Sequence, residues 1–486
     1  MTRTKRREAE RGVETWFTPS FASLFIGKGR YHGDLGVPMP LPPFGRRHSQ
    51  TVARDGPVDY SAASMTHQAA ASGLSIFQHR DFRFYLLARL CAVLAVQIES
   101  VAIGWQVYEL TGSALALGYT GLAQFLPFLS LCLVGGQVAD RVDRRTILAV
   151  CQTVMLVCSL LLLAFTLGHI RDVRFVYGVL VLFGAARAFH APAGSALTPH
   201  LVPPEHLTRA VAINSTTWQV ATIGGPAVGG ILYGWIGAAG AYTASATLCA
   251  LSVIWILILK VRTGRASAEP LSLSTLVAGL GFVRRQRLLL GSITLDLFAV
   301  LFGGAVALLP IYARDILHTG PWGLGLLRCA PAFGAAVVAV FLAMRPMGGN
   351  TGRKMFIAVA IFGAATLVFG MSRSLPLSLA ALAIAGAADM ISVVVRHTLE
   401  LMATPDDMRG RVGAVNMMAI GASNELGEFR AGGFAEYLGA VPAVVAGAVG
   451  TLAVVALWAW AFPELRRVDR LESFARTKEP PATPAS

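Results

Sequence analysis

Several ionisable residues of this chain lie inside long apolar runs, where a charged side chain is costly. They are Glu99, Arg187, Asp296, Arg328, Asp389, Arg396, Glu425, Glu428 and Arg430. Charged groups at membrane depth usually serve ion, proton or substrate transfer. A buried carboxylate that takes a proton on one side of a membrane and releases it on the other can drive the movement of a second molecule. The carboxylates among these residues, which we predict to be the proton-binding groups, are Glu99, Asp296, Asp389, Glu425 and Glu428.

The elements that must position these residues are membrane-spanning helices. Of the 486 residues, 55% are hydrophobic and only 14% are charged, which is too apolar for a soluble domain of this length. A bilayer core about 30 Å thick requires about 20 mostly apolar residues per helix. The windows that meet this requirement are 86–109, 114–137, 146–168, 174–197, 211–236, 240–260, 288–312, 322–344, 355–371, 376–395, 414–438 and 441–462. Because strand-type alternation is absent, we predict an all-α polytopic membrane protein with twelve transmembrane helices.

The two halves of the chain repeat one plan. At one constant offset, Arg209 and Gly230 correspond to Arg411 and Gly432. Each half holds an even number of predicted helices, so the copies share one orientation and are related by an axis along the membrane normal. The predicted domains are a disordered basic tail at 1–74, a six-helix bundle at 75–260, a cytoplasmic linker at 261–287, a second six-helix bundle at 288–465 and a tail at 466–486. Within the first tail, Met65 is an alternative natural start.

Glu99 and Asp296 rank first among the carboxylates because they fall in related helices of the two halves. A second interpretation stays open for both of them. A fixed ion pair with Arg187 or Arg328 would hold helices together without transferring protons. The two interpretations differ in where the arginines lie, which the sequence does not determine.

The net charge of +14 is concentrated in one set of alternate connections between the predicted helices. Examples are the basic stretches at 141–145, 260–287 and 345–354. By the positive-inside rule, these connections and both termini lie in the cytoplasm. The charge thus reflects membrane topology, and we expect no nucleic-acid partner. Because no nucleophile–base set, metal-ligand spacing or nucleotide-binding loop is present in the sequence, we expect neither catalysis nor a metal or organic cofactor.

A Gly-rich and charged stretch, GGQVADRVDRR at 135–145, separates two apolar runs. Gly136 is followed by Asp140 and then by Arg144 and Arg145 at regular spacing. This stretch, together with YELTGS, ARAFHAPA, RGRVGAVN and NELGEFRAGG, resembles the efflux branch of the major facilitator superfamily, which includes enterobactin exporters and macrolide-efflux proteins. The resemblance extends over residues 75–472.

The resemblance implies a multi-pass exporter of the bacterial cytoplasmic (inner) membrane. Its cargo would be a bulky amphipathic small molecule of siderophore or drug type, moved by alternating access. The resemblance also implies that Gly136, Asp140, Arg144 and Arg145 form a gate, in which Asp140 is held near the cytoplasmic start of the eleventh helix. The alternative is that the arginines are ordinary basic residues of a cytoplasmic connection.

A second Gly-rich stretch, GGPAVGG at 224–230, lies inside the fifth predicted helix. Its residues Gly225, Pro226, Gly229 and Gly230 resemble the signature of the superfamily's antiporters and imply proton antiport. Close packing between helices would also explain these residues. The stretch therefore supports export without deciding the energy source.

Side chains of several kinds are predicted to line the path between the halves. The polar and apolar members are Trp105, Gln124, Asn214, Trp218, Phe298 and Met417, with Arg187, Arg328 and Arg396 as charge partners. We predict that these residues line the path as a set and make no prediction for a single member. Any one aromatic or Met side chain in a membrane protein more often contacts the core or the lipid.

Two other functions fit parts of this sequence. A nutrient importer would share the fold, but the antiporter-like stretch disfavours it. A membrane scaffold or sensor without transport is supported only by the long basic N-terminal tail. We therefore expect a monomeric exporter whose partners are one small-molecule substrate, protons and the lipid bilayer, with the proton gradient as its energy source.

Replacement of Asp140 tests the predicted gate. We expect Asp140→Asn to impair transport without lowering the amount of protein in the membrane, because a neutral amide loses the attraction of a carboxylate to a helix N-terminus. The measurement is substrate flux normalised to membrane abundance. Flux equal to that of the unchanged protein would remove the gating role.

Overall fold

The computed structural model describes residues 76–261, 273–345, 349–405 and 408–468. Within these ranges, the side chains of Leu133, Asp140 and residues 273–276 are not described. The chain divides into two compact units, residues 1–78 and 79–486. Of the first unit only a 3-10 helix, η1 (Ile76–Gln78), is described, so the predicted tail at 1–74 lies outside the described residues. The second unit holds the other described elements.

Long α-helices make up the first half of this unit. They are α3 (Arg80–Thr111), α4 (Ala114–Arg141), α5 (Arg144–Leu167), α6 (Val173–Leu197) and α7 (Leu207–Ile258), with the 3-10 helices η2 (Thr198–His200) and η3 (Pro204–His206) between α6 and α7. Gly237 interrupts α7 with a positive φ of 69°, which glycine adopts without a steric penalty. The predicted windows at 211–236 and 240–260 therefore lie on either side of this break.

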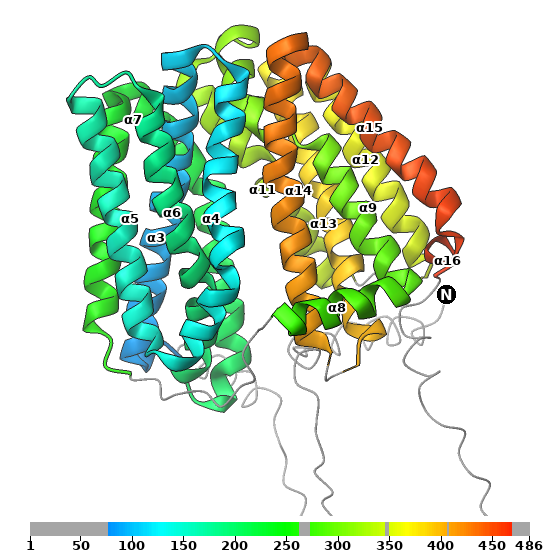
Figure 1. Cartoon of the computed structure of the whole chain (residues 1–486), viewed down its shortest axis with the longest axis horizontal. Coiled ribbons are helices and arrows are strands. Elements are labelled where there is room, and N and C mark those ends of the chain that lie inside the picture. The colour runs from blue at the N-terminus through cyan, green and yellow to red at the C-terminus, as the bar shows by residue number, and fades with distance from the viewer. Residues whose placement is uncertain (1–75, 262–272, 346–348, 406–407, 469–486) are drawn as a thin grey trace, which may run out of the picture. The chain divides into compact units, whose positions relative to one another are not determined.

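The second half begins with α8, which falls in the predicted linker and runs across the other helices in Figure 1. Its elements are α8 (Leu273–Arg285), α9 (Arg287–Gly303), η4 (Val306–Leu308), α10 (Leu309–Ile311), the π-helix η5 (Tyr312–Ile316), α11 (Gly320–Met344), α12 (Thr351–Met371), α13 (Leu375–Ala403), α14 (Arg409–Leu438), α15 (Ala440–Ala461) and α16 (Pro463–Arg466). Among the described residues the structure is all-helical, which confirms the predicted fold class.

Local sequence explains where several helices begin and end. Gly112 ends α3 in the left-handed conformation, with φ of 62°. Ser113 then caps α4 by accepting a hydrogen bond from the backbone N–H of Ala116. Asp143 and Asp172 cap α5 and α6 in the same way. The local sequence thus determines where the turns between these helices lie.

Ten helical segments of the described chain are long and apolar enough to cross a membrane. Helix α7, with its break at Gly237, counts once among them, because the segment Pro204–Ile258 is continuous. Helix α14 is absent from this set although it is 30 residues long. It carries the charged residues Glu425, Glu428 and Arg430 within its length. The number twelve remains a prediction.

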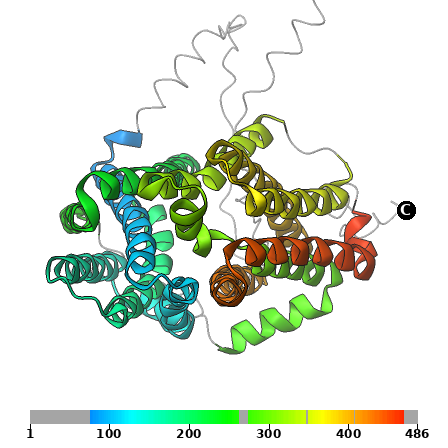
Figure 2. The same cartoon turned by 90° about the horizontal axis from the view of Figure 1, so that it is seen from above.

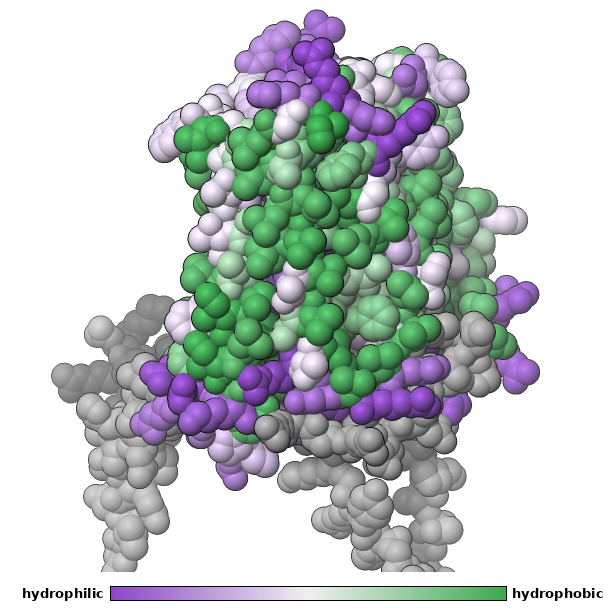
Figure 3. All heavy atoms as spheres, turned by 60° about the vertical axis from the view of Figure 1, so that its left-hand side comes forward, coloured by the Kyte–Doolittle hydropathy of each residue, from purple (hydrophilic) through white to green (hydrophobic). Residues whose placement is uncertain are grey.

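The two halves stand side by side (Figures 1 and 2). Helix α4 packs against α14, and α7 packs against α11. Other extensive contacts stay within one half, such as α3 with α7 and α11 with α13. The face in Figure 3 carries a broad apolar band with hydrophilic residues at both ends, as a protein in a bilayer requires.

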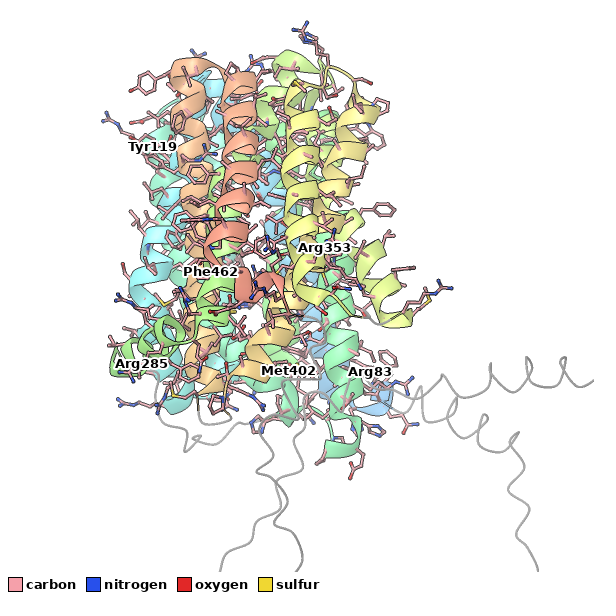
Figure 4. All side chains as sticks on the ribbon, turned by 90° about the vertical axis from the view of Figure 1, so that its right-hand side faces the viewer. Arg83, Tyr119, Arg285, Arg353, Met402 and Phe462 are labelled. Atoms are coloured by element: carbon pink, nitrogen blue, oxygen red, sulfur yellow. The ribbon has the colours of Figure 1, made fainter. Side chains whose placement is uncertain are left out.

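The two ends of this unit are distinguished by the helices that lie there. The upper end, at the top of Figure 1, is where α3 ends and α4 begins. The lower end is where α4 ends and α8 lies. Figure 4 places Arg83, Arg285 and Met402 at the lower end, far from Tyr119.

Glycines bring the two halves into close contact toward the upper end. A Cβ on Gly432 of α14 would lie 2.6 Å from the carbonyl oxygen of Ala114 in α4. A Cβ on Gly230 of α7 would lie 2.6 Å from the carbonyl oxygen of Pro321 in α11. Small residues of this kind allow helix backbones to approach each other in a membrane.

Glycines also set the packing inside the second half, and this predicts a stability change. A Cβ on Gly386 of α13 would collide with the carbonyl group of Pro331 in α11. We therefore expect Gly386→Val to destabilise the protein by about 1–3 kcal/mol, the usual cost of overpacking, and to lower its unfolding temperature in detergent. The control is Gly433→Val, because nothing lies within 4 Å of a Cβ at Gly433. Equal unfolding temperatures for the two variants would contradict this account.

Candidate functional site

Charged side chains from both halves meet where α4 approaches α14. A Cβ on Gly121 of α4 would lie 2.8 Å from Glu425 Oε2 and 3.4 Å from Glu428 Oε2, so both carboxylates reach the first half. Arg328 of α11 donates a hydrogen bond to the hydroxyl of Ser100 in α3. The carboxylates and the guanidinium group therefore bridge the boundary between the halves.

A second arginine, on α6, completes this charge cluster. The guanidinium group of Arg187 lies 5.9 Å from the centre of the Phe128 ring, and the side chain is exposed. Arg187 interacts electrostatically with both Glu425 and Glu428, and Arg328 does so with Glu428. With both carboxylates ionised, the two arginines balance their charge. We call Arg187, Arg328, Glu425 and Glu428 the junction cluster.

Below the junction cluster, side chains on the facing helices become exposed. Gly421 and Met417 continue, toward the lower end, the face of α14 that carries Gly432 and Glu425. Gly432 is buried, whereas Met417 is 67% exposed. On α7, the side chain of Trp218 is 46% exposed. The halves thus pack closely at the upper end and leave these side chains accessible further down.

Glu99, one of the two carboxylates ranked first from the sequence, lies inside the first half. Its Oε2 accepts hydrogen bonds from Ser159 Oγ of α5 at 2.5 Å and from Ser245 Oγ of α7 at 2.7 Å. The side chain is only 5% exposed. The suggested ion pair of Glu99 with Arg187 is wrong, because serine hydroxyls satisfy the carboxylate and Arg187 faces the junction cluster.

Asp296, the other carboxylate ranked first, forms an ion pair with Arg396 of α13 in the core of the second half. Both side chains are buried. The suggested partner Arg328 is wrong, because that residue lies at the boundary with Ser100. Asp296 therefore does form a fixed ion pair, as the second interpretation proposed, but its partner is Arg396.

The other charged candidates have separate environments. Asp389 is half-buried on α13, and no hydrogen bond or ion pair joins it to another described residue. Arg430 of α14 donates to the carbonyl oxygens of Leu301 and Phe302 at the end of α9, at 2.9 and 2.6 Å. It therefore ties two helices of the second half together.

The arginines of the predicted gate bind backbone groups of their own half. Arg144 donates to the carbonyl oxygen of Ala196 at 3.0 Å, and Arg145 donates to that of Leu257 at 2.5 Å. They fasten the start of α5 to the ends of α6 and α7. Gly136 lies buried in α4, and the backbone of Asp140 belongs to the last turn of that helix, whereas its side chain is not described.

The predicted lining residues divide into core and boundary positions. Trp105 was expected at the path, but it is 9% exposed and packs against Tyr233, with ring centres 6.4 Å apart, inside the first half. Its position on the inner face of α3 explains this correction. Phe298 packs against Trp458 in the second half at 5.3 Å. Gln124 Nε2 donates to a carbonyl oxygen of its own helix.

One further lining candidate lacks a partner. Asn214, on α7, is half-buried, and its Oδ1 accepts no hydrogen bond from a described residue. A buried amide oxygen without a donor is uncommon in folded proteins. Asn214 Oδ1 is therefore a buried acceptor without a donor among the described residues.

The glycines at 225–230 are contact points on α7. A Cβ on Gly225 would lie 2.5 Å from Gln97 Cβ, and one on Gly229 would lie 2.9 Å from the backbone of Ile98. Gly230 and the Pro226 carbonyl group face Gly325 of α11. These residues pack α7 against one helix of each half.

Sequence reasoning missed several polar residues that shape these environments. They are Ser100, Ser159, Ser245, Tyr108, Asp315 and Glu436. Single hydroxyl groups inside apolar runs were the available signal for the serines, because a polar group at membrane depth needs a partner. Tyr108, Asp315 and Glu436 lie near helix ends, where polar residues are ordinary and give no such signal.

Comparisons with known proteins agree with this arrangement. Residues 71–484 match the family model described as a transmembrane secretion effector. An enterobactin exporter of Citrobacter koseri is 26% identical over 412 residues, which cover 83% of this chain and 97% of that protein. A solved POT family transporter superposes with a TM-score of 0.64 at 12% identity, covering 79% of this chain and 96% of that one.

A second solved structure, a bacterial homologue of the iron transporter ferroportin in its inward-facing state, has a TM-score of 0.60 at 16% identity. The superposition covers 80% of this chain and 99% of that one. At identities this low, both structures show the fold alone.

The ion pair between Asp296 and Arg396 predicts a measurable coupling. Asp296→Asn and Arg396→Gln each leave one buried charge without its partner, and we expect each to cost about 3–5 kcal/mol of stability. The double variant should cost less than the sum of the single variants, because no buried charge remains. The measurement is unfolding of the purified variants in detergent.

The control for this cycle is the exposed pair of Arg287 and Glu464, whose side chains meet at 3.2 Å. These side chains are 67% and 51% exposed. Glu464→Gln should change stability by less than about 1 kcal/mol. Strictly additive losses for Asp296 and Arg396 would show that the two charges do not depend on each other.

Proposed function

We propose that this chain, which belongs to the transmembrane secretion effector family of major facilitator transporters, exports a small molecule from the cytoplasm. The family match spans residues 71–484, and the chain is a multi-pass membrane transporter. The cargo in this proposal is a bulky amphipathic molecule of siderophore or drug type. Similarity to an enterobactin exporter over most of both chains favours the siderophore type. The proposal assigns no catalytic step.

The lower end faces the cytoplasm in this proposal. Arg83 and Arg285 lie there, and cytoplasmic connections are enriched in Lys and Arg. Both termini of the transporter would then be cytoplasmic. Exposed Met417 and Trp218 would be reachable by a cargo that enters from the cytoplasm.

The way in which the halves meet supports the proposal of alternating access. Glycine contacts close the upper end, and side chains on the facing helices are accessible below the junction cluster. Rocking of one half against the other would open the upper end and close the lower one. We propose that the cargo is released outside after this movement, from a transporter that acts as a monomer.

The proposal of proton antiport is based on the junction cluster. Arg187 belongs to the first half, whereas Glu425 and Glu428 belong to the second. A proton on either carboxylate removes one negative charge and weakens the attraction between the halves at this level. Proton binding and the relative position of the halves are thereby linked. Glu99, Asp296 and Asp389 lie within single halves and lack this cross-boundary contact.

Cargo and energy source are tested together in cells. The probes are a catecholate siderophore and a fluorescent cationic drug, whose accumulation is measured with and without the protein. We expect lower accumulation of the siderophore when the protein is present, and restored accumulation after an uncoupler collapses the proton gradient. Unchanged accumulation of both probes would contradict the proposed export.

Glu428→Gln tests the junction cluster in purified protein reconstituted into liposomes. We expect the variant to lose the acceleration of transport by a pH gradient and to keep exchange of cargo at equilibrium, because exchange requires no net proton movement. The control is Glu109→Gln, which removes an exposed carboxylate that binds Tyr233 in the first half. Undiminished acceleration in Glu428→Gln would exclude this carboxylate from proton coupling.

A further inference from the structure

Glu436 connects the two halves at the upper end. It lies near the end of α14, two residues before Leu438. Its Oε2 accepts hydrogen bonds from Ser113 Oγ at 2.8 Å and from the backbone N–H of Leu115 at 3.0 Å. Ser113 is the residue that caps α4, so the carboxylate of one half binds the N-terminus of a helix in the other. Such a position favours an anion.

The residues that precede Glu436 on the same face of α14 also contact α4. Gly432, one turn earlier, meets Ala114 and Gly118, and the backbone of Phe429 meets Gly118. The rings of Phe429 and Tyr119 lie 5.5 Å apart. Glu436 thus lies at the upper end of a continuous contact between α4 and α14. This contact positions its carboxylate at the start of α4.

A second contact between the halves lies beside Glu436. Tyr108 of α3 donates a hydrogen bond to Asp315 of the π-helix η5, and the Arg314 guanidinium lies 5.5 Å from the Tyr108 ring centre. Glu436 also interacts electrostatically with Tyr108. Two exposed carboxylates, Asp315 and Glu436, thus make contacts between the halves at the upper end.

Helices α4 and α14 run antiparallel where they meet. Gly118 meets Gly432, Gly121 meets Glu425 and Glu428, and Gly421 approaches Phe125. Because the two helices are antiparallel, the last turn of α4, which contains the backbone of Asp140, and the start of α14 at Arg409 both lie toward the lower end. Each helix of the pair therefore has an acidic residue in its last turn, Asp140 in α4 and Glu436 in α14.

We propose that Glu436 is a gating residue of the upper end, the counterpart of Asp140 at the lower end, and that it holds the transporter in the state described here. This inference rests on the proposed alternating access. When Glu436 binds the N-terminus of α4, the upper ends are held together. Release of Glu436 lets the upper ends separate, and the last turn of α4 then approaches the start of α14 at the other end.

The test measures the distance between the upper ends by electron paramagnetic resonance. Spin labels are attached to Arg171→Cys in the first half and Arg373→Cys in the second, which are exposed positions between α5 and α6 and between α12 and α13. The six native cysteines are replaced by alanine beforehand. Because only a distance is measured on full-length purified protein, the result does not depend on any cargo.

We expect Glu436→Ala to raise the ratio of upper-end-open to upper-end-closed molecules roughly fivefold, the effect of losing one helix cap. Ser113→Gly should shift the ratio in the same direction, because it removes the hydroxyl donor while a glycine still tolerates the cap position. The control is Glu109→Ala, an exposed carboxylate of the upper end whose hydrogen bond stays within the first half. Its ratio should equal that of the labelled parent.

The inference is overturned if Glu436→Ala and Ser113→Gly give the same distances as Glu109→Ala. That result would leave the proposed export intact, since the export assays do not depend on it. Conversely, if Glu436→Ala changes the ratio of open to closed molecules but the cells show no export, the gating role of Glu436 is supported and the proposed function is rejected. The two proposals therefore fail separately.

Discussion

The contact between α4 and α14 sets the geometry on which the other features depend. Gly118 and Gly432 let the two backbones approach each other toward the upper end. Because nothing larger than hydrogen separates them there, Gly121 comes within reach of Glu425 and Glu428 one to two turns below. The junction cluster and the Glu436 contact thus both follow from the same pair of small residues.

Burial of charge divides the molecule into fixed and adjustable parts. Asp296 is paired with Arg396 inside one half, and Glu99 is satisfied by two serine hydroxyls inside the other. In the proposed alternating access, such arrangements would move with their half as rigid units. The junction cluster instead draws its charges from both halves, so its energy changes when the halves move. A transporter needs charges that are fixed within one half as well as charges shared between the halves. Rigid halves can transmit a change in charge at their boundary to the rest of the protein.

Much of the fold could be predicted from the sequence. Most apolar windows agree with the long helices within several residues at each end, and Gly112, Ser113 and Asp143 mark turns by their own chemistry. The window 288–312 was wrong as one helix, because α9 ends at Gly303 and the short helices η4 and α10 follow it. The chosen ionisable residues could be found because charge stands out in an apolar run. The ranking of the carboxylates as candidates for proton coupling could not be predicted. Glu99 and Glu428 lie in similar apolar sequence and differ only in the residues that surround them in the fold.

The sequence by itself determined that this chain forms helices in a membrane, since a bilayer requires helices or a closed barrel and the strand-type alternation of a barrel is absent. It also determined which residues are costly to bury. Only the tertiary structure decided their partners: Arg396 for Asp296, serines for Glu99, and α4 for Glu436. The physical reason is that each partner lies far away in the chain, and their meeting depends on how each helix is rotated and how closely two helices approach.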